Sequence, residues 1–488
     1  MEEVIVMPEK IFAPRKLIEP LAAEKLNKSI PNFVNMDGCI RDAIEARLDS
    51  GTGPEDPDVY QDLMNRLQAC QERLPAIYQE DVCIPYINKL KRIGQNGFNK
   101  ILRRDPFKIG EASLMLDIAQ AILQNGERYL QKATDAYQEV LSDLYDGFLS
   151  EEDRIGVKKP DLSVLPPLAK WGCPDDGPYT WTAASTQYFG FGKRTAIVNL
   201  PPAHARLGIL AWAALGHETC GHDILDADDG LVPELANALQ VELEDGDVGS
   251  ILPSYWSYRI DETASDVLGM LNMGPAAGIA LVGYFRALNA AAGKEPILGN
   301  IGPRDSNAVH PVDILRGYLA AAITRQLEFS DRDEWAKAIE MEVDKDLRAI
   351  RLGSARTGFI DISPDYARRS AEIVAETLVH GKVDALEYHS LGEIQNWRDE
   401  DEWTMMELRS LLTRTGPLPN LYAEGVYAAH AVSAAVIAAL AGDGPISIIF
   451  DRMQGILKAM HDANPSWGPL YIAHPGDLVF IRVHETYE

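Results

Sequence analysis

Two histidines and a glutamate lie within six consecutive positions of the chain, directly after an apolar segment. Residues 217–222 have the sequence HETCGH, and residues 209–215 are apolar throughout, which predicts a buried helix. Imidazole nitrogen is a favoured zinc ligand, and a carboxylate beside the first histidine can act as general base toward a metal-bound water. His217, Glu218 and His222 are therefore candidates for a metal site with hydrolytic chemistry.

The spacing of the two histidines requires a local departure from a regular helix. His217 and His222 are five positions apart, which places them about 140° apart around an α-helix. One metal ion cannot bind both unless the helix gains one residue, and a single-turn π-bulge provides it. Gly221, directly before the second histidine, permits this distortion. We therefore predict a π-bulge across the motif.

A second helix is predicted over residues 258–271, and it carries two acidic residues on one face. Glu262 and Asp266 are four positions apart, so both side chains point the same way. Glu262 would be the third metal ligand, and Asp266 would accept a hydrogen bond from a ligand histidine and fix its tautomer. Tyr258, one turn before Glu262, is expected to point toward the same metal.

The segments HETCGH and, downstream, DETASD resemble the metal-binding motifs of zinc metallopeptidases of the gluzincin type. The resemblance is strongest to the dipeptidyl-peptidase III family, in which an HExxGH motif precedes a helix with an acidic pair and a further acid four positions on. By position, it implies three zinc ligands, a general base and two flanking acids, namely His217, His222 and Glu262, then Glu218, then Asp261 and Asp266. The match covers two short segments of a 488-residue chain, so it describes a site and not a whole fold.

Residues 307–318 offer hydrogen-bond donors for the oxyanion that forms when a peptide bond is cleaved. His310 is the first candidate, because Pro311 suits the first turn of a helix and would place His310 at a helix N-terminus. A downstream histidine has this role in thermolysin-like enzymes; a plain capping histidine is the alternative. Tyr318 is the second candidate. Arg316 would either bind a substrate carbonyl or carboxylate, or pair with Asp313.

Two further features near the motif each allow two interpretations. Cys220 would either ligate the metal as a fourth ligand or face the helix packing, and packing is favoured because catalysis needs an open metal position. Acidic clusters at residues 223–230 and 242–247 would either bind calcium or form solvated loops. Neither cluster has the spacing of an EF-hand, so solvated loops are favoured.

Composition limits the partners and the compartment. The net charge of −27 and the pI near 4.8 argue against nucleic acid or an anionic membrane surface as a partner. No apolar run reaches the roughly 18 residues of a membrane span. Five scattered cysteines and an N-terminus without signal-peptide features favour a reducing compartment, so a cytoplasmic location is expected. The expected partner is a peptide or a small-molecule substrate, and the oligomeric state is not predicted.

The length of the chain predicts more than one region, and its patterns predict a mainly α (α+β) protein. We divide it into an N-terminal helical region (1–155), a zincin-like catalytic core with a small sheet (156–330) and a C-terminal helical region (331–488). Long helices are predicted at 107–128, 129–145, 331–347, 363–380 and 421–440. Strands are predicted at 179–192, 194–200 and 478–483. The resemblance to gluzincin peptidases implies that 196–200 is an edge strand that would pair with a substrate; an ordinary hairpin under the core is the alternative.

These features together predict a zinc-dependent hydrolase. The first expectation is a metallopeptidase that cleaves short peptides, in which zinc lowers the pKa of its bound water and Glu218 takes the proton and passes it to the leaving amine. One alternative is a zinc enzyme that acts on a non-peptide amide or ester, or on a modified peptide in a biosynthetic pathway. The other is a catalytically inactive binding protein built on a peptidase scaffold.

Overall fold

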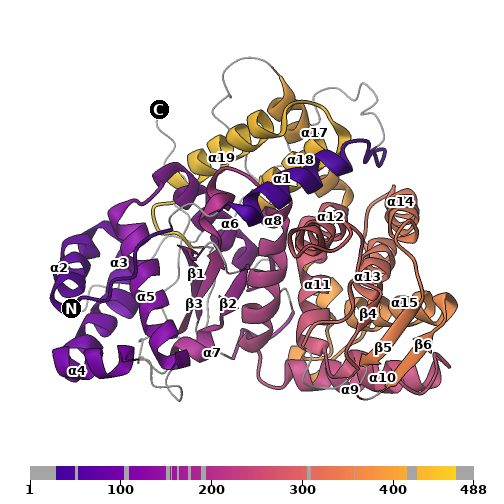
Figure 1. Ribbon diagram of the computed structural model, residues 1–488, viewed down its shortest axis with the longest axis horizontal. Helices are drawn as coiled ribbons and strands as arrows, with labels where there is room; N and C mark the ends of the chain where they lie inside the picture. The colour runs from indigo at the N-terminus through magenta and orange to yellow at the C-terminus, as the bar shows by residue number, and fades with distance from the viewer. Residues whose placement is uncertain are drawn as a thin grey trace, which may run out of the picture.

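A computed structural model describes most of the chain (Figure 1). The described residues are 29–49, 53–103, 109–149, 154, 156–161, 164–173, 177–187, 194–304, 309–354, 356, 358–414 and 426–468. They form a mainly helical fold with two small β-sheets, as the predicted mainly α class requires. Among the helices in these ranges, none combines the length and the apolar character needed to cross a membrane.

The helices fall into three groups along the chain. Before the first strand lie α1 (Met36–Leu48), α2 (Tyr60–Cys70), α3 (Ala76–Tyr78), α4 (Ile84–Leu102), α5 (Ile109–Glu127) and α6 (Gln131–Leu149). In the middle lie α7 (Ala183–Thr186), α8 (Ile209–Leu215), α9 (Leu231–Asp245), α10 (Leu252–Ser257), α11 (Ile260–Met273), α12 (Pro275–Ala291) and α13 (Asp313–Gln326). Last come α14 (Arg332–Asp344), α15 (Pro364–His380), α16 (Leu391–Ile394), α17 (Asp399–Thr413), α18 (Ala428–Ala441) and α19 (Ile446–Asp462).

The predicted long helices are present, with ends that shift by a few residues. The one predicted at 421–440 begins later, at Ala428, and residues 415–425 lie outside the described part of the chain. The strand predicted at 478–483 also lies outside it.

The central sheet has three strands in the order β1-β3-β2, and it corrects the predicted edge strand. Strand β1 (Val164–Trp171) runs parallel to β3 (Arg194–Leu200), and β2 (Tyr179–Trp181) runs antiparallel to β3. Residues 196–200 therefore lie in the middle of the sheet, and β2 lies at its edge. The strand predicted over 179–192 is only three residues long, because a short helix, α7, begins at Ala183.

Strand β1 was not predicted, and it contains two prolines, which are unusual inside a strand. Pro166 and Pro167 lie where the pairing register with β3 shifts, between Leu165 and Leu168. Proline lacks the N–H that a ladder needs, and it is tolerated in edge strands and at bulges. Both proline carbonyls accept side-chain hydrogen bonds instead, from Tyr78 at 2.9 Å and from the Gln138 amide at 2.8 Å.

A second sheet was also missed, and its strands come from the middle and the C-terminal regions of the chain. It has the order β4-β5-β6, with β4 (Ile301–Gly302) parallel to β5 (Ile350–Ser354) and β6 (Gly358–Ile362) antiparallel to β5. This sheet lies with α13, α14 and α15 at the opposite end of the molecule from α2–α4 (Figure 1).

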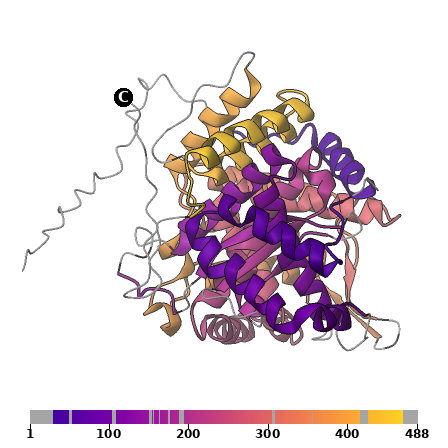
Figure 2. The ribbon, with the colours of Figure 1, turned by 90° about the vertical axis from the view of Figure 1, so that its left-hand side faces the viewer.

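The central sheet separates two hydrophobic cores. Ile197 on β3 packs with a smaller core formed mainly by α2–α5, the helices in front in Figure 2, whereas the next residue, Val198, belongs to the main core. This alternation follows from the period of two in a strand. The main core contains residues from α1 through α19 and so draws on all three regions named above. The division into regions stays a prediction, since the packing shows no break at 155 or 330.

A buried lysine ties all three strands of the central sheet to α5. Lys170 of β1 is 2% exposed, and its ammonium lies 2.8 Å from Asp117 Oδ1, 2.9 Å from the Tyr179 hydroxyl and 3.0 Å from Asn199 Oδ1. Asp117 Oδ2 also accepts hydrogen bonds from Tyr179 at 2.8 Å and from the Trp181 indole at 2.6 Å. This network fixes the short strand β2, which has only three residues to pair with β3.

We expect Lys170→Met to destabilise the fold by about 3–5 kcal/mol, because it leaves the Asp117 carboxylate buried without its cation. The double variant Lys170→Met/Asp117→Asn should recover part of this loss. Chemical denaturation measures both. Arg351→Met is the matched control, since it breaks an exposed ion pair with Asp361 and should cost less than about 1 kcal/mol. Equal losses in Lys170→Met and Arg351→Met would contradict the assigned role of the buried lysine.

Candidate metal centre

The predicted π-bulge is present in the helix that carries the two histidines. Helix α8 is completely buried, and it continues into the π-helical segment η5 (Gly216–Asp223). The wider turn brings the His217 and His222 rings onto the same side, with their centroids 4.8 Å apart and their planes at 89°. A spacing of five residues therefore serves one site here, as the wider π-turn allows.

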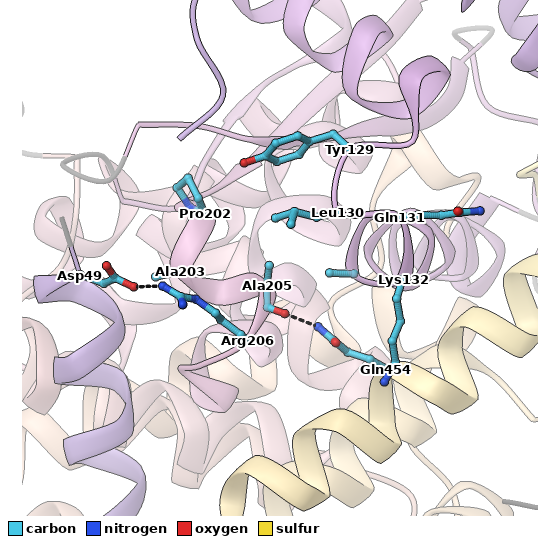
Figure 3. Close-up of a pocket in the computed structure, with 11 residues that line it drawn as sticks. Asp49, Tyr129, Leu130, Gln131, Lys132, Pro202, Ala203, Ala205, Arg206 and Gln454 are labelled. Atoms are coloured by element: carbon cyan, nitrogen blue, oxygen red, sulfur yellow. Dashed lines mark hydrogen bonds and ion pairs between the residues drawn. The ribbon is translucent and has the colours of Figure 1, made fainter. Parts of the chain in front are cut away.

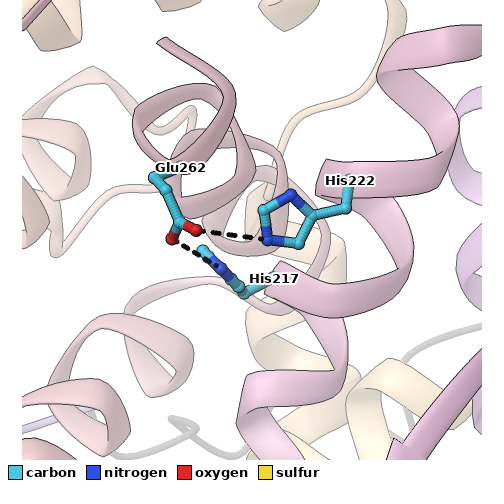
Figure 4. Close-up of side chains that lie close together, drawn as sticks. All are labelled: His217, His222 and Glu262. Atoms are coloured by element: carbon cyan, nitrogen blue, oxygen red, sulfur yellow. Dashed lines mark ion pairs between the residues drawn. The ribbon is translucent and has the colours of Figure 1, made fainter. Parts of the chain in front are cut away.

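The three predicted metal ligands converge on one point (Figure 4). One ligand atom from each of His217, His222 and Glu262 lies within 4.8 Å of the other two. His217 Nε2 is 3.3 Å from Glu262 Oε2, and His222 Nε2 is 3.7 Å from Glu262 Oε1. Glu262 comes from the first turn of α11, so two helices supply the cluster.

Both flanking acids orient the histidines from behind. Asp266 Oδ1 lies 2.9 Å from His217 Nδ1, and Asp261 Oδ2 lies 2.8 Å from His222 Nδ1. The predicted hydrogen bond from a histidine to Asp266 is thus present. Because each Nδ1 lies against a carboxylate, Nε2 is the nitrogen of each ring that is directed toward the cluster.

Arg316 forms a further layer behind Asp266, which corrects both predictions for this residue. Its guanidinium donates to both Asp266 oxygens, at 2.8 and 2.7 Å, and lies over the Phe285 ring at 4.5 Å. It is buried, so it is not presented to a substrate. Asp313 is not its hydrogen-bond partner: Asp313 Oδ2 accepts from the Asn289 amide at 2.8 Å.

The charges of this cluster support one another. Burial alone would lower the pKa of His217, but contacts with Asp266 and Glu262 outweigh it and raise the pKa to about 10. Burial would likewise raise the pKa of Glu262, but His217, Arg316 and His310 lower it to about 2. At neutral pH, His217 therefore carries a proton that a metal ion must displace, so metal affinity should rise with pH.

The cluster fits a zinc ion by its donor atoms and its spacing. Among the described residues, no group donates a hydrogen bond to Glu262 Oε2, although this oxygen is buried. Two neutral imidazole nitrogens and a carboxylate oxygen are typical zinc ligands, with zinc–ligand distances of about 2.0–2.2 Å, and a tetrahedron of that size has edges of roughly 3.3–3.6 Å. The two histidine–glutamate separations, 3.3 and 3.7 Å, are close to these edges, and all three ligand atoms lie within 4.8 Å of one another.

Glu218 and Cys220 lie inside the π-helical segment without joining the three ligand groups. Glu218 is 7% exposed, and its Oε2 accepts a hydrogen bond of 2.8 Å from the hydroxyl of Thr180 on β2. Cys220 is fully buried, and its thiol lies 3.9 Å from the Leu144 carbonyl on α6. Burial raises the pKa of this thiol, so it faces the packing as favoured from the sequence.

His310 is brought to the cluster, although not by a helix N-terminus. Its Nε2 lies 3.1 Å from Glu262 Oε1, and its side chain is 62% exposed. Helix α13 begins at Asp313, so the predicted helix start at Pro311 is wrong, and His310 lies in the loop before the helix. Arg259 holds this loop by donating to the His310 carbonyl at 3.2 Å. Partial desolvation of the ring where it meets the cluster lowers the pKa of His310; the Glu262 charge opposes this shift and the Arg316 charge adds to it.

The structure does not bring Tyr318 or Tyr258 into the cluster. Tyr318 follows Arg316 by two positions, about 200° around α13, and its hydroxyl donates to Asp344 on α14 at 2.8 Å. Tyr318 is therefore a wrong prediction for the oxyanion donor. Tyr258 precedes α11, which begins at Ile260, so helical spacing does not direct it toward Glu262; it is 65% exposed.

The hydrogen bond from Thr180 to Glu218 was not predicted from the sequence. Thr180 pairs with a residue 38 positions away, so no local spacing links it to Glu218. The only signal was its place between two aromatic residues, Tyr179 and Trp181, in a segment predicted to be a strand.

The acidic loop after the motif is partly buried and bonded within the protein, so the favoured prediction of a solvated loop is wrong for part of it. Asp228 is buried and forms an ion pair with Arg154, whose Nη2 lies 2.6 Å from Asp228 Oδ2. The Asp229 N–H donates to Asp161 at 2.9 Å. These contacts join the acidic loop, which follows η5, to the segment before β1.

A cavity of about 560 Å³ lies apart from the cluster (Figure 3). Its walls come from the turn before α6, the segment 202–206 and α19. Two of its polar side chains are engaged within the protein: Arg206 pairs with Asp49, and the Gln454 amide donates to the Ala205 carbonyl at 2.8 Å. The cavity shares no residue with the cluster.

Close contact between η5 and α11 depends on residues without large side chains. A Cβ added to Gly221 would lie 2.1 Å from the Ser265 Cβ, and one added to Gly216 would lie 3.1 Å from the Gly269 Cα. Gly221 has no positive φ, so its role is this close approach and not the backbone freedom expected from the sequence.

We expect Gly221→Ala to separate the two helices and to destabilise the protein by about 1–3 kcal/mol, as overpacking does. It should also weaken zinc binding, because Glu262 moves away from the histidines. Gly110→Ala is the matched control, since a Cβ there meets nothing within 4 Å and α5 should gain stability. Thermal unfolding and zinc titration measure these effects; unchanged zinc affinity in Gly221→Ala would contradict the packing argument.

We expect Asp266→Asn to weaken zinc binding about 10- to 100-fold, as loss of an outer partner does. The change removes a buried negative charge and leaves Arg316 with Glu262, at 3.9 Å, as its remaining anionic partner in the cluster. Asp261→Asn is the comparison, because the Asp261 side chain is 56% exposed and solvent screens its charge, so the loss should be smaller. Competition with a chelator at fixed pH gives both affinities, and the reverse order would refute this explanation.

Comparison with known proteins assigns no family. No protein-family model, curated protein or solved structure matches this chain. The resemblance to gluzincin peptidases therefore rests on the two motif segments, and the geometry of the cluster is the basis on which a function can be argued.

Proposed function

We propose that this protein is a zinc-dependent hydrolase, and specifically a metallopeptidase that acts on short peptides. The observation that carries the proposal is the convergence of His217, His222 and Glu262 on one point, with Glu218 beside them and outside the ligand set. Under this proposal the central sheet, η5 and α11 form a zincin-like core.

The proposal gives each residue of the cluster a distinct role. His217, His222 and Glu262 would hold a zinc ion, which would serve as a Lewis acid toward a substrate carbonyl group and a water molecule. Glu218 takes a proton from the attacking water and delivers it to the leaving amine. Its carboxylate is buried and hydrogen-bonded to Thr180, which supports a fixed position for the base.

His310 is the proposed donor to the oxyanion. It is the exposed member of the group around Glu262, so its ring can reach a bound substrate. The pKa of His310 is lowered, chiefly by desolvation, and this favours the neutral imidazole. A neutral imidazole still carries one N–H, which can donate to the developing negative charge on the carbonyl oxygen.

A peptide substrate is favoured by the position of β2. Among the described residues, β2 pairs with β3 alone, so its outer edge has backbone groups to offer to an extended peptide. The same strand contacts the proposed base through Thr180. This arrangement favours a peptide over the non-peptide amide or ester considered as an alternative.

A purely structural metal site is less consistent with the geometry. Structural zinc sites close with four protein ligands, whereas catalytic sites keep one position open. Among the described residues, three side chains converge closely enough to bind one metal ion: two histidines and one glutamate. We also propose a cytoplasmic location, supported by cysteines that are all free.

The test compares metal content and turnover in three proteins. We expect one zinc per chain in the wild type and in Glu218→Gln, and none in His217→Ala. Hydrolysis of a peptide library should occur with the wild type alone, because Glu218→Gln keeps the ligands and removes the base. Zinc in the wild type without any turnover would favour the inactive binding protein, and absence of zinc after reconstitution would refute the proposal.

A further inference from the structure

We propose that Thr180 is a positioning residue for the general base: its hydroxyl holds the Glu218 carboxylate in the orientation from which it takes a proton from water. This inference rests on the proposed function and adds a residue that the motif resemblance does not include. Thr180 lies on the sheet and Glu218 lies on the metal-binding segment, so their contact joins two parts of the core.

The hydroxyl of Thr180 makes two contacts with the same residue. Its Oγ1 lies 2.8 Å from Glu218 Oε2 and 3.0 Å from the Glu218 backbone carbonyl. The carboxylate is therefore held against its own backbone by one side chain. A glutamate has three side-chain torsions, and a hydrogen bond to its ionised end selects one arrangement among them.

The position of Thr180 is itself determined by the opposite face of β2. Successive side chains in a strand point to opposite faces, so Tyr179 and Trp181 point toward α5 while Thr180 points toward η5. Tyr179 and Trp181 both donate to Asp117 Oδ2, and the backbone of Thr180 pairs with Val198. The anchored aromatic residues leave Thr180 little freedom to move away from Glu218.

A positioned base matters because proton transfer needs hydrogen-bond distance between the base and the water. Misplacement of a catalytic group by about 1 Å can cost roughly 100-fold in rate. Without the hydroxyl, the Glu218 side chain can rotate away while the zinc ligands, which are anchored separately by Asp261 and Asp266, stay in place. Loss of positioning should therefore lower kcat and leave metal binding unchanged.

The experiment uses zinc-loaded full-length protein and the peptide substrate found in the library screen. Thr180→Val keeps the shape of the side chain and removes the hydroxyl; Thr180→Ser keeps the hydroxyl. Thr195→Val is the matched control, because Thr195 is a buried threonine of β3 whose hydroxyl has no hydrogen-bond partner in the described residues.

We expect kcat of Thr180→Val to fall about 10- to 100-fold, with KM changed by less than about threefold and one zinc per chain retained. Thr180→Ser should recover kcat to within about fivefold of the wild type, and Thr195→Val should keep wild-type kcat. Wild-type kcat in Thr180→Val, or a Thr180→Ser variant as slow as Thr180→Val, would overturn the role of Thr180 and leave the proposed function standing. No turnover by the wild type itself would overturn both.

Discussion

The two helical segments that carry the cluster touch at the level of their backbones. Gly216 lies against Gly269 and Gly221 lies against Ser265, with no room for a larger side chain at either crossing. Only at this separation can His217 reach Asp266 while its other nitrogen faces Glu262. Glycine costs a helix roughly 1 kcal/mol relative to alanine. These glycines therefore do not stabilise the helices. Their presence is explained by the short distance between η5 and α11 that the cluster requires.

That close contact also creates a buried group of four charges that must balance. His217 and Arg316 are cationic, Glu262 and Asp266 are anionic, and each lies next to a group of opposite sign. Burial of any one of them alone would favour its neutral form. Under the proposed function, a divalent cation would replace the proton on His217, so its binding would change the net charge of the group by less than two units. Arg316 lowers the pKa of both Glu262 and Asp266, which keeps these acids ionised.

Local periodicity was enough to predict the cluster but not the elements around it. The five-residue spacing of His217 and His222 required a π-bulge, and the four-residue spacing in α11 placed Glu262 and Asp266 on one face. These relations hold within one helix each, where sequence distance fixes direction. Arg316 and Tyr318 show the limit: both lie on α13, but which of them faces the cluster depends on how that helix packs against α11.

The order of the central sheet could not be predicted for a related reason. The resemblance implied that residues 196–200 of β3 lie at the edge, yet β3 is the middle strand, with Ile197 buried in one core and Val198 buried in the other. The true edge, β2, is three residues long and is held by side chains as much as by its ladder. Under the proposed function, a peptide would pair with the outer edge of β2, and Thr180 of the same strand contacts Glu218. Substrate binding and the position of the base would therefore depend on one short strand.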